Sequence, residues 1–72
     1  MFKAVRVLSM YDRMIQGKGI VKTDEAHRFG VDTRTIQRDL DDIRVYLAEE
    51  GLRRELVFDK KSLMYVIRER TD

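Results

Sequence analysis

The sequence predicts a mainly α-helical fold that ends in a β-hairpin. Apolar residues recur every three or four positions through the longer N-terminal part, then alternate or run together near the C-terminus. Glycines stand near the changes of pattern. The chain has 72 residues, 43% of them hydrophobic, which suits one small domain with a folded core. We therefore expect residues 1–72 to form three helices and one hairpin.

Residues 3–16, KAVRVLSMYDRMIQ, predict the first helix. Apolar residues at helical spacing give it one stripe that faces the core. The stripe consists of Ala4, Val7, Leu8, Tyr11, Met14 and Ile15. Gly17 and Gly19 follow at once, and glycine readily adopts the left-handed backbone of helix ends. The helix should therefore end at Gln16.

Residues 22–30, KTDEAHRFG, predict a short second helix. Thr23 is the expected N-cap, and Asp24 and Glu25 suit the positive end of the helix dipole. Few apolar residues are present, so Phe29 should be the main anchor of this helix to the core. We expect it to be the least stable element alone.

The third helix should run from Thr33 to about Glu50. Gly30 permits a tight turn before it, Asp32 is the expected N-cap, and Gly51 should end it. Apolar residues step by four, three and four positions and so share one stripe. The stripe consists of Ile36, Leu40, Ile43 and Leu47. Its regularity makes this the clearest helix in the chain.

After Gly51 the apolar period changes to that of strands. The segments ELVFD and SLMYVIRE predict a hairpin over residues 55–68, with Lys60 and Lys61 at its tip. Alternation places two sets of apolar side chains on matching faces of the strands. The sets are Leu63, Tyr65 and Ile67 on the second strand, and Leu56 and Phe58 on the first.

Two helices joined by a short glycine-containing turn make a helix-turn-helix, whose second helix can lie in the major groove of DNA. The hairpin that follows makes the predicted fold a winged helix-turn-helix. Polar residues on the first turns of the third helix suit base edges, since arginine pairs with guanine, glutamine with adenine, and threonine with several bases. The candidate base contacts are Thr33, Arg34, Thr35, Gln37 and Arg38. The candidate backbone contacts are Lys22, Arg28, Lys60 and Lys61, which would add affinity but little sequence information.

The charges are unevenly distributed although the formal net charge is only +2. Residues 28–38 hold three arginines and one aspartate, and residues 53–70 hold six basic and three acidic residues. Residues 39–50 instead hold five acidic residues and one arginine. Phosphates would repel the acidic half, so the third helix should leave the duplex there. The residues concerned are Asp41, Asp42, Glu49 and Glu50.

The segment FGVDTRTIQRDLDDIR, residues 29–44, also carries a family resemblance. It resembles the recognition region of the DeoR-like winged-helix domains that begin WYL-domain bacterial transcription regulators. The matching pattern runs from Phe29 to Asp39, and the first helix and the hairpin also look similar. The resemblance therefore covers nearly the whole chain.

This resemblance implies sequence-specific binding to double-stranded DNA, normally as a homodimer. In the family, the DNA-binding unit is normally followed by a ligand-sensing WYL domain and a C-terminal dimerising extension. We expect neither within residues 1–72, which would then be either an excised domain or an unusually short relative. Asp32 stands where serine is commoner, and Glu25 stands where many relatives have leucine. Asp32 still provides a cap, although its charge could oppose a nearby phosphate.

Other interpretations of the same residues remain open. Arg34 and Arg38 could be solvated, or could pair with Asp39 and Asp42 at local helix spacing, and Arg38 could then act structurally. Lys60 and Lys61 could serve solubility alone, or could contact phosphate or the minor groove. A winged helix that binds an acidic protein partner rather than DNA is the main alternative function. The polar side chains at residues 33–38 favour DNA over that alternative.

Several function classes have little support in the sequence. There is no cysteine, one histidine and no phosphate-binding glycine loop, so we expect no enzyme activity, cofactor, metal site or small-molecule ligand. No apolar run is long enough to span a membrane, and the charged start does not resemble a signal peptide. We therefore expect a cytoplasmic protein whose partner is double-stranded DNA.

Overall fold

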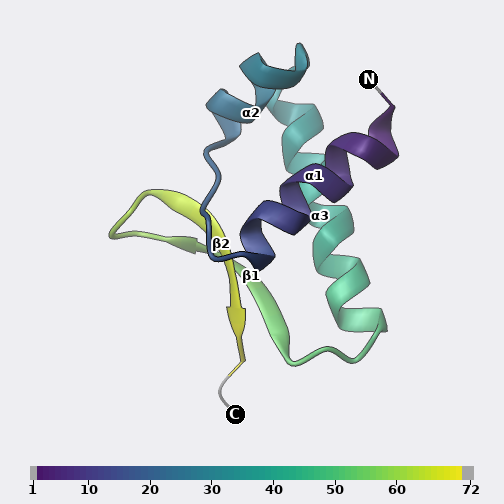
Figure 1. The fold of residues 1–72 in the computed structure, drawn as a ribbon, viewed down its shortest axis with the longest axis vertical. Coiled ribbons are helices and arrows are strands. Elements are labelled where there is room, and N and C mark those ends of the chain that lie inside the picture. Colours follow the sequence, from purple (N-terminus) through teal and green to yellow (C-terminus); the bar gives the residue numbers. More distant parts are fainter. Residues whose placement is uncertain (1, 71–72) are drawn as a thin grey trace.

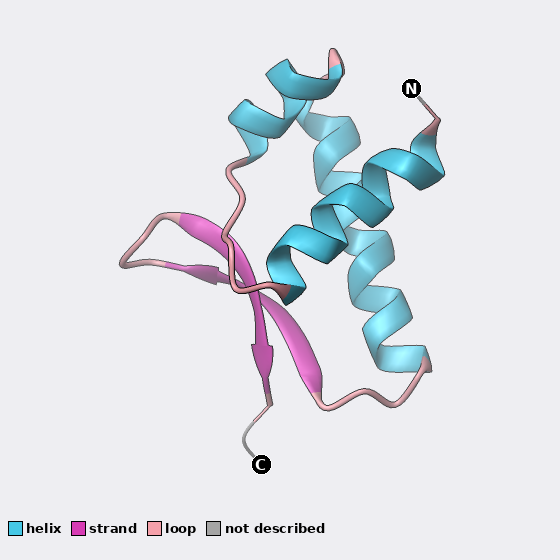
Figure 2. Ribbon diagram, viewed as in Figure 1, coloured by secondary structure: helices cyan, strands magenta, loops and turns pink. Residues whose placement is uncertain are grey.

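The computed structural model describes residues 2–70. Its elements are α1 (Lys3–Ile15), α2 (Lys22–Phe29), α3 (Thr33–Glu49), β1 (Arg54–Asp59) and β2 (Met64–Glu69). In Figure 1, α1 crosses α3, and α2 lies toward one end of α3. Figure 2 shows the hairpin beside the helices, with its tip projecting away from them. This is the predicted winged helix-turn-helix topology, and each helix ends within one residue of its expected boundary.

The core forms around the predicted stripe of α3. Ile36, Leu40, Ile43 and Leu47 are each at most 2% exposed, which confirms the periodicity of this helix. The other elements add buried apolar side chains to the same cluster. These are Met10 and Met14 of α1, Ile20 of the following connector, Ala26 of α2 and Leu56 of β1. One continuous core therefore holds the three helices and the hairpin together.

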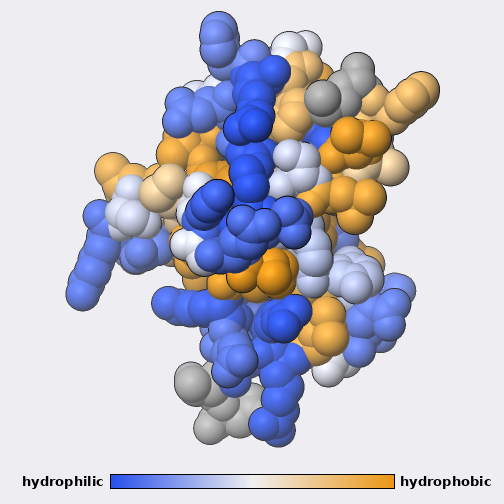
Figure 3. Space-filling view, viewed as in Figure 1, coloured by the Kyte–Doolittle hydropathy of each residue, from blue (hydrophilic) through white to orange (hydrophobic). Residues whose placement is uncertain are grey.

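The buried face of α1 is rotated from the predicted one. Arg6, Met10 and Met14 are buried, whereas Ala4, Leu8 and Ile15 are exposed, so the prediction was wrong for the last three. Arg6 turns inward because it pairs with Asp39 on α3. Exposed apolar side chains, including the 64% exposed Leu8, therefore remain on α1. Figure 3 shows hydrophobic surface gathered beside the N-terminal part of the chain.

The start of α2 also differs from the prediction. Val21, not Thr23, is the N-cap, and no side chain accepts a capping hydrogen bond there. The preceding Ile20 forms an antiparallel bridge with Tyr65 of β2, its N–H donating to the Tyr65 carbonyl oxygen at 2.9 Å. That bridge holds the chain extended up to the first helical residue, so α2 begins one residue before Thr23. Phe29 packs against the core as expected.

A partly buried ion pair provides the second attachment of α2. The Arg13 guanidinium on α1 donates two hydrogen bonds to the Glu25 carboxylate, at 2.9 and 2.5 Å. Glu25 is 5% exposed, so its charge faces the arginine rather than solvent. This pairing explains why a carboxylate, not an apolar side chain, occupies this inward position of α2.

The hairpin pairs β1 with β2 in antiparallel register. Leu56 lies opposite Ile67 and Phe58 opposite Tyr65, which confirms that these four side chains share matching faces. Leu63 does not belong to this set, because β2 begins at Met64. Leu63 lies in the turn with a φ of 59° and is 65% exposed, so the prediction that it shares one strand face with Tyr65 and Ile67 was wrong.

Candidate nucleic-acid interface

The N-terminus of α3 is capped as the sequence predicts. The Asp32 carboxylate accepts a hydrogen bond from the Arg34 backbone N–H at 2.8 Å. The same oxygen lies 3.3 Å from Nε of the Arg34 side chain. Mainly through the backbone hydrogen bond, these contacts lower the pKa of the Asp32 carboxyl. The Asp32 carboxylate therefore stays charged at neutral pH, and its negative charge faces the backbone N–H and the guanidinium of Arg34.

Three of the five candidate base contacts lie exposed on the first turns of α3. These are Thr33, Arg34 and Arg38, and the Arg34 side chain is 85% exposed. The only ion pair of Arg34 within the described residues is with the exposed Asp32. Exposed pairs of this kind contribute about 0–1 kcal/mol, so an external phosphate or base can replace the carboxylate.

Arg38 keeps its charge available to a partner. Within residues 2–70 its side chain makes no hydrogen bond or ion pair. The suggested local partners are engaged elsewhere, since Asp39 pairs with Arg6 and Asp42 pairs with Lys3 at 2.8 Å. The interpretation that Arg38 is held by these acidic neighbours is therefore wrong. Both cations that hold the aspartates come from α1.

The Gln37 side chain is held by two hydrogen bonds, unlike that of Arg38. Its side-chain oxygen accepts a hydrogen bond from the Lys22 ammonium at 3.0 Å, and its nitrogen donates to the Asp41 carboxylate at 3.0 Å. Arg44 donates to the same Asp41 oxygen, also at 3.0 Å. A contact between Gln37 and a base would have to replace at least one of these hydrogen bonds. Thr35, the fifth candidate, is half-buried.

Lys22, a candidate backbone contact, joins three elements. Besides its hydrogen bond to Gln37 on α3, its ammonium lies 5.6 Å from the centroid of the Tyr65 ring on β2. Arg44 makes a second link, because its Nε donates to the Leu56 carbonyl oxygen of β1 at 3.4 Å. The wing-facing side of α3 thus continues into the hairpin through polar contacts. Sequence reasoning missed Arg44, although its spacing of seven from Gln37 places it on the same side of the helix.

The other candidate backbone contacts are exposed. Arg28 lies on the outer side of α2, with its guanidinium 5.9 Å from the centroid of the Phe29 ring. Lys60 and Lys61 lie in the turn of the hairpin. The structure therefore places candidate cations at both ends of α2, on α3 and at the wing tip.

A buried ion pair sets the orientation of α3. Arg6 donates from Nε and Nη2 to the two Asp39 carboxylate oxygens, at 2.5 and 3.0 Å. The two side chains are only 8% and 1% exposed. The Asp39 carboxylate raises the pKa of the Arg6 guanidinium, mainly through their hydrogen bonds. Sequence reasoning missed this pair, whose only signal was that Arg6 precedes the buried Met10 and Met14 at four-residue steps.

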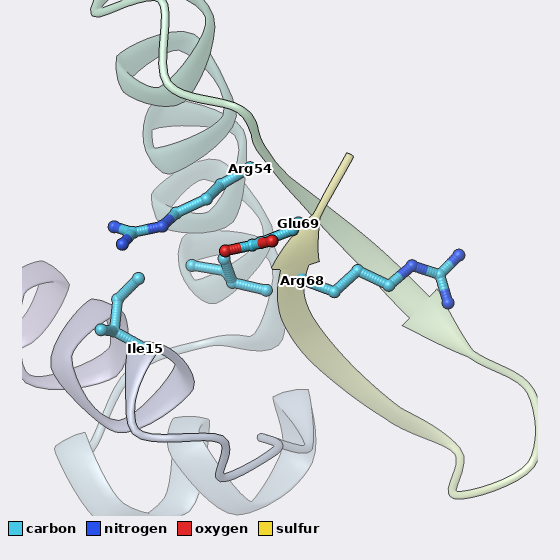
Figure 4. A pocket seen from close by; sticks show the side chains of 5 residues that line it. Ile15, Arg54, Arg68 and Glu69 are labelled. Carbon is cyan, nitrogen blue, oxygen red and sulfur yellow. The ribbon is translucent and has the colours of Figure 1, made fainter. Parts of the chain in front are cut away.

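A pocket of about 280 Å³ lies at the base of the hairpin, against the end of α1. Figure 4 shows Arg54 and Glu69 extending toward Ile15, while Arg68 points to the other side of the hairpin. Arg54 and Glu69 are register partners in the two strands. Ile67 completes the apolar wall with Ile15. None of the candidate DNA-contact residues lines this pocket.

The geometry is that of a winged helix-turn-helix with an exposed basic face at the start of its second motif helix. No family model, curated protein or solved structure matches the chain. No helix within residues 2–70 is both long and apolar enough to cross a membrane. The same residues contain no cluster of three or more histidine or acidic side chains suited to a metal ion.

Proposed function

We propose that the chain binds double-stranded DNA sequence-specifically, as the DNA-binding part of a bacterial transcription regulator in the cytoplasm. α3 enters the major groove, and the hairpin lies over the adjacent backbone. The observation that carries the proposal is the availability of Arg34 and Arg38. One is paired only with an exposed cap residue, and the other makes no hydrogen bond or ion pair in the described part of the chain.

The charge pattern of α3 supports this orientation. Its buried acid, Asp39, is neutralised by Arg6, and its exposed acids Asp41 and Asp42 pair with Arg44 and Lys3. Among the described residues, the cap Asp32 is therefore the one carboxylate that pairs with an arginine of the first turns. Such a helix start offers bidentate donors to guanine and cations to phosphate. A functional unit would be a homodimer that reads two half-sites, as the resemblance to WYL-domain regulators suggests, because one small domain makes few contacts.

The test is fluorescence anisotropy of a labelled random-sequence duplex pool at low and moderate salt. We expect salt-sensitive binding by the wild type and its loss in the double variant Arg34→Ala, Arg38→Ala. The matched control is Arg54→Ala, Arg68→Ala, which removes the same charge from the hairpin base. If both double variants lost DNA binding equally, the loss would be explained by the lower net charge and not by the position of Arg34 and Arg38.

Selection of a preferred site then permits a finer test. Arg34→Ala should cost about 1–3 kcal/mol on that site and relax one base preference. Lys60→Ala or Lys61→Ala should weaken binding to all sequences and lower the salt slope by about one. A protein-binding winged helix instead predicts no salt-sensitive binding to any duplex. That result would reject DNA as the partner.

A further inference from the structure

The turn of the hairpin is tightly held although it lies at the surface. It comprises residues 60–63, between the strand ends Asp59 and Met64. The Asp59 carboxylate accepts hydrogen bonds from the Lys61 backbone N–H at 3.1 Å and from the Ser62 hydroxyl at 3.0 Å. The Asp59 carbonyl oxygen accepts the Leu63 N–H at 2.8 Å. These contacts give the turn one defined shape.

That shape places Leu63 in an unfavourable backbone conformation. Its φ is 59°, and it is the one residue other than glycine with a positive φ in the described part of the chain. Glycine adopts this region freely and asparagine tolerates it, whereas a bulky side chain there is strained. The strain is not offset by burial, because Leu63 is 65% exposed. Stability of the turn alone would favour glycine.

The surroundings of Leu63 indicate a partner. Lys60 and Lys61 are exposed in the same turn. Phe58 on the adjoining strand is 45% exposed, and the centroid of its ring lies 5.1 Å from that of Tyr65. Asp59, the nearest acid, turns its carboxylate to the loop backbone and Ser62. The tip is therefore an apolar point next to two cations. Proteins that bind the minor groove combine cations with apolar side chains inserted at base steps.

We propose that the hairpin tip enters the minor groove, with Leu63 against the base edges and Lys60 and Lys61 on the flanking phosphates. This inference rests on the proposed DNA binding and gives the wing a role in selecting sequence. The guanine 2-amino group projects into the minor groove and obstructs an apolar side chain there. The tip should therefore favour A·T pairs, independently of the bases that α3 contacts.

The test compares three duplexes of alternating sequence, d(A-T), d(I-C) and d(G-C). Inosine lacks the 2-amino group, so an I·C pair resembles A·T in the minor groove and G·C in the major groove. We expect Leu63→Gly and Leu63→Asn to weaken binding about tenfold on d(A-T) and d(I-C), the effect of exposing one apolar side chain, and to change binding to d(G-C) little. The matched control is Leu8→Ala, which alters an equally exposed leucine on α1.

Thermal unfolding separates a binding role from a structural one. Both variants relieve the strained φ, so their unfolding temperature should equal or exceed that of the wild type while their affinity falls. Wild-type affinity of the variants for d(A-T), or equal loss on all three duplexes, would overturn the minor-groove role and leave DNA binding by α3 intact. Absence of salt-sensitive binding to every duplex would reject DNA binding and this inference together.

Discussion

Asp39 and Asp41 lie two residues apart on α3, on opposite sides of the helix. Asp39 faces α1, where its side chain is 1% exposed and pairs with the buried Arg6. Asp41 faces the wing, where its side chain is 58% exposed and contacts Gln37 and Arg44. An advance of two residues turns a helix by about 200°, which accounts for the two environments.

The difference shows how one helix combines a fixed side with an exchangeable side. A buried charge that loses its partner is left without solvation, so the Arg6–Asp39 pair holds α3 against α1. An exposed ion pair is hardly more stable than the same two charges solvated by water. The contacts of Asp41 can therefore be exchanged when another molecule approaches. The candidate interface lies away from the fixed side, so binding there leaves the packing of the helices intact.

The largest expected effect is on the fixed side. Arg6→Met or Asp39→Leu alone should lower the free energy of unfolding by about 3–5 kcal/mol, because each leaves one buried charge unpaired. The double variant Arg6→Met, Asp39→Leu should recover most of that loss. Urea denaturation of the four proteins at pH 7 completes the double-mutant cycle.

Asp41→Ala is the matched control on the exchangeable side. It should change the free energy of unfolding by no more than about 1 kcal/mol, and less as salt is added. If Asp39→Leu were no more destabilising than Asp41→Ala, burial would not be what separates the two aspartates.

A smaller effect should come from the connector that attaches the hairpin. A Cβ atom on Gly19 would lie 2.8 Å from Cβ of Met64, closer than two carbon atoms can pack. Gly19→Ala should therefore shift the strand and cost about 1–3 kcal/mol, as overpacking usually does. Chemical denaturation measures it, with the neighbouring exposed Lys18→Ala as control. A stability equal to that of Lys18→Ala would mean that the hairpin moves freely relative to the connector.

The smallest effect concerns the exposed cap of α3 and depends on pH. The pKa of Asp32 is lower in the folded chain than its ordinary value of 3.8, so the charged carboxylate stabilises the fold above that pH. This stabilisation is lost as pH falls through the folded pKa. Asp32→Asn retains a capping oxygen without the charge. The urea midpoints of Asp32→Asn and the wild type should differ by a constant amount near neutral pH, and this difference should shrink below about pH 4. A difference independent of pH would exclude the carboxylate charge as its cause.

The fold was predictable where it depends on local spacing. The stripe of α3 and the pairing of Leu56 with Ile67 follow from periods of the sequence, and both are confirmed. The face of α1 was predicted wrongly because it depends on a partner 33 positions away, which made a charged Arg6 an inward residue. Leu63 was misplaced because its apolar side chain extends a strand-like pattern into the turn.

The candidate site was predictable only in part for the same reason. The exposure of Arg34 and Arg38 follows from their positions opposite the core stripe of α3. The engagement of Gln37 does not, because it requires Lys22 to approach from α2, and the links to Tyr65 and Leu56 require the docked hairpin. DNA contact by any of these residues stays a prediction.

The bridge between Ile20 and Tyr65 offers a way to follow the docking of the wing separately from the folding of the hairpin. It joins the connector between α1 and α2 to the C-terminal strand, positions far apart in the sequence, through two backbone hydrogen bonds, whereas the strands of the hairpin pair locally. Closing a long loop costs more entropy than forming a short turn, so this bridge should assemble after the hairpin. Hydrogen exchange at the amides of Ile20 and Tyr65 would therefore record the docking of the wing separately from its formation. Loosening this bridge would let the wing move without unfolding it.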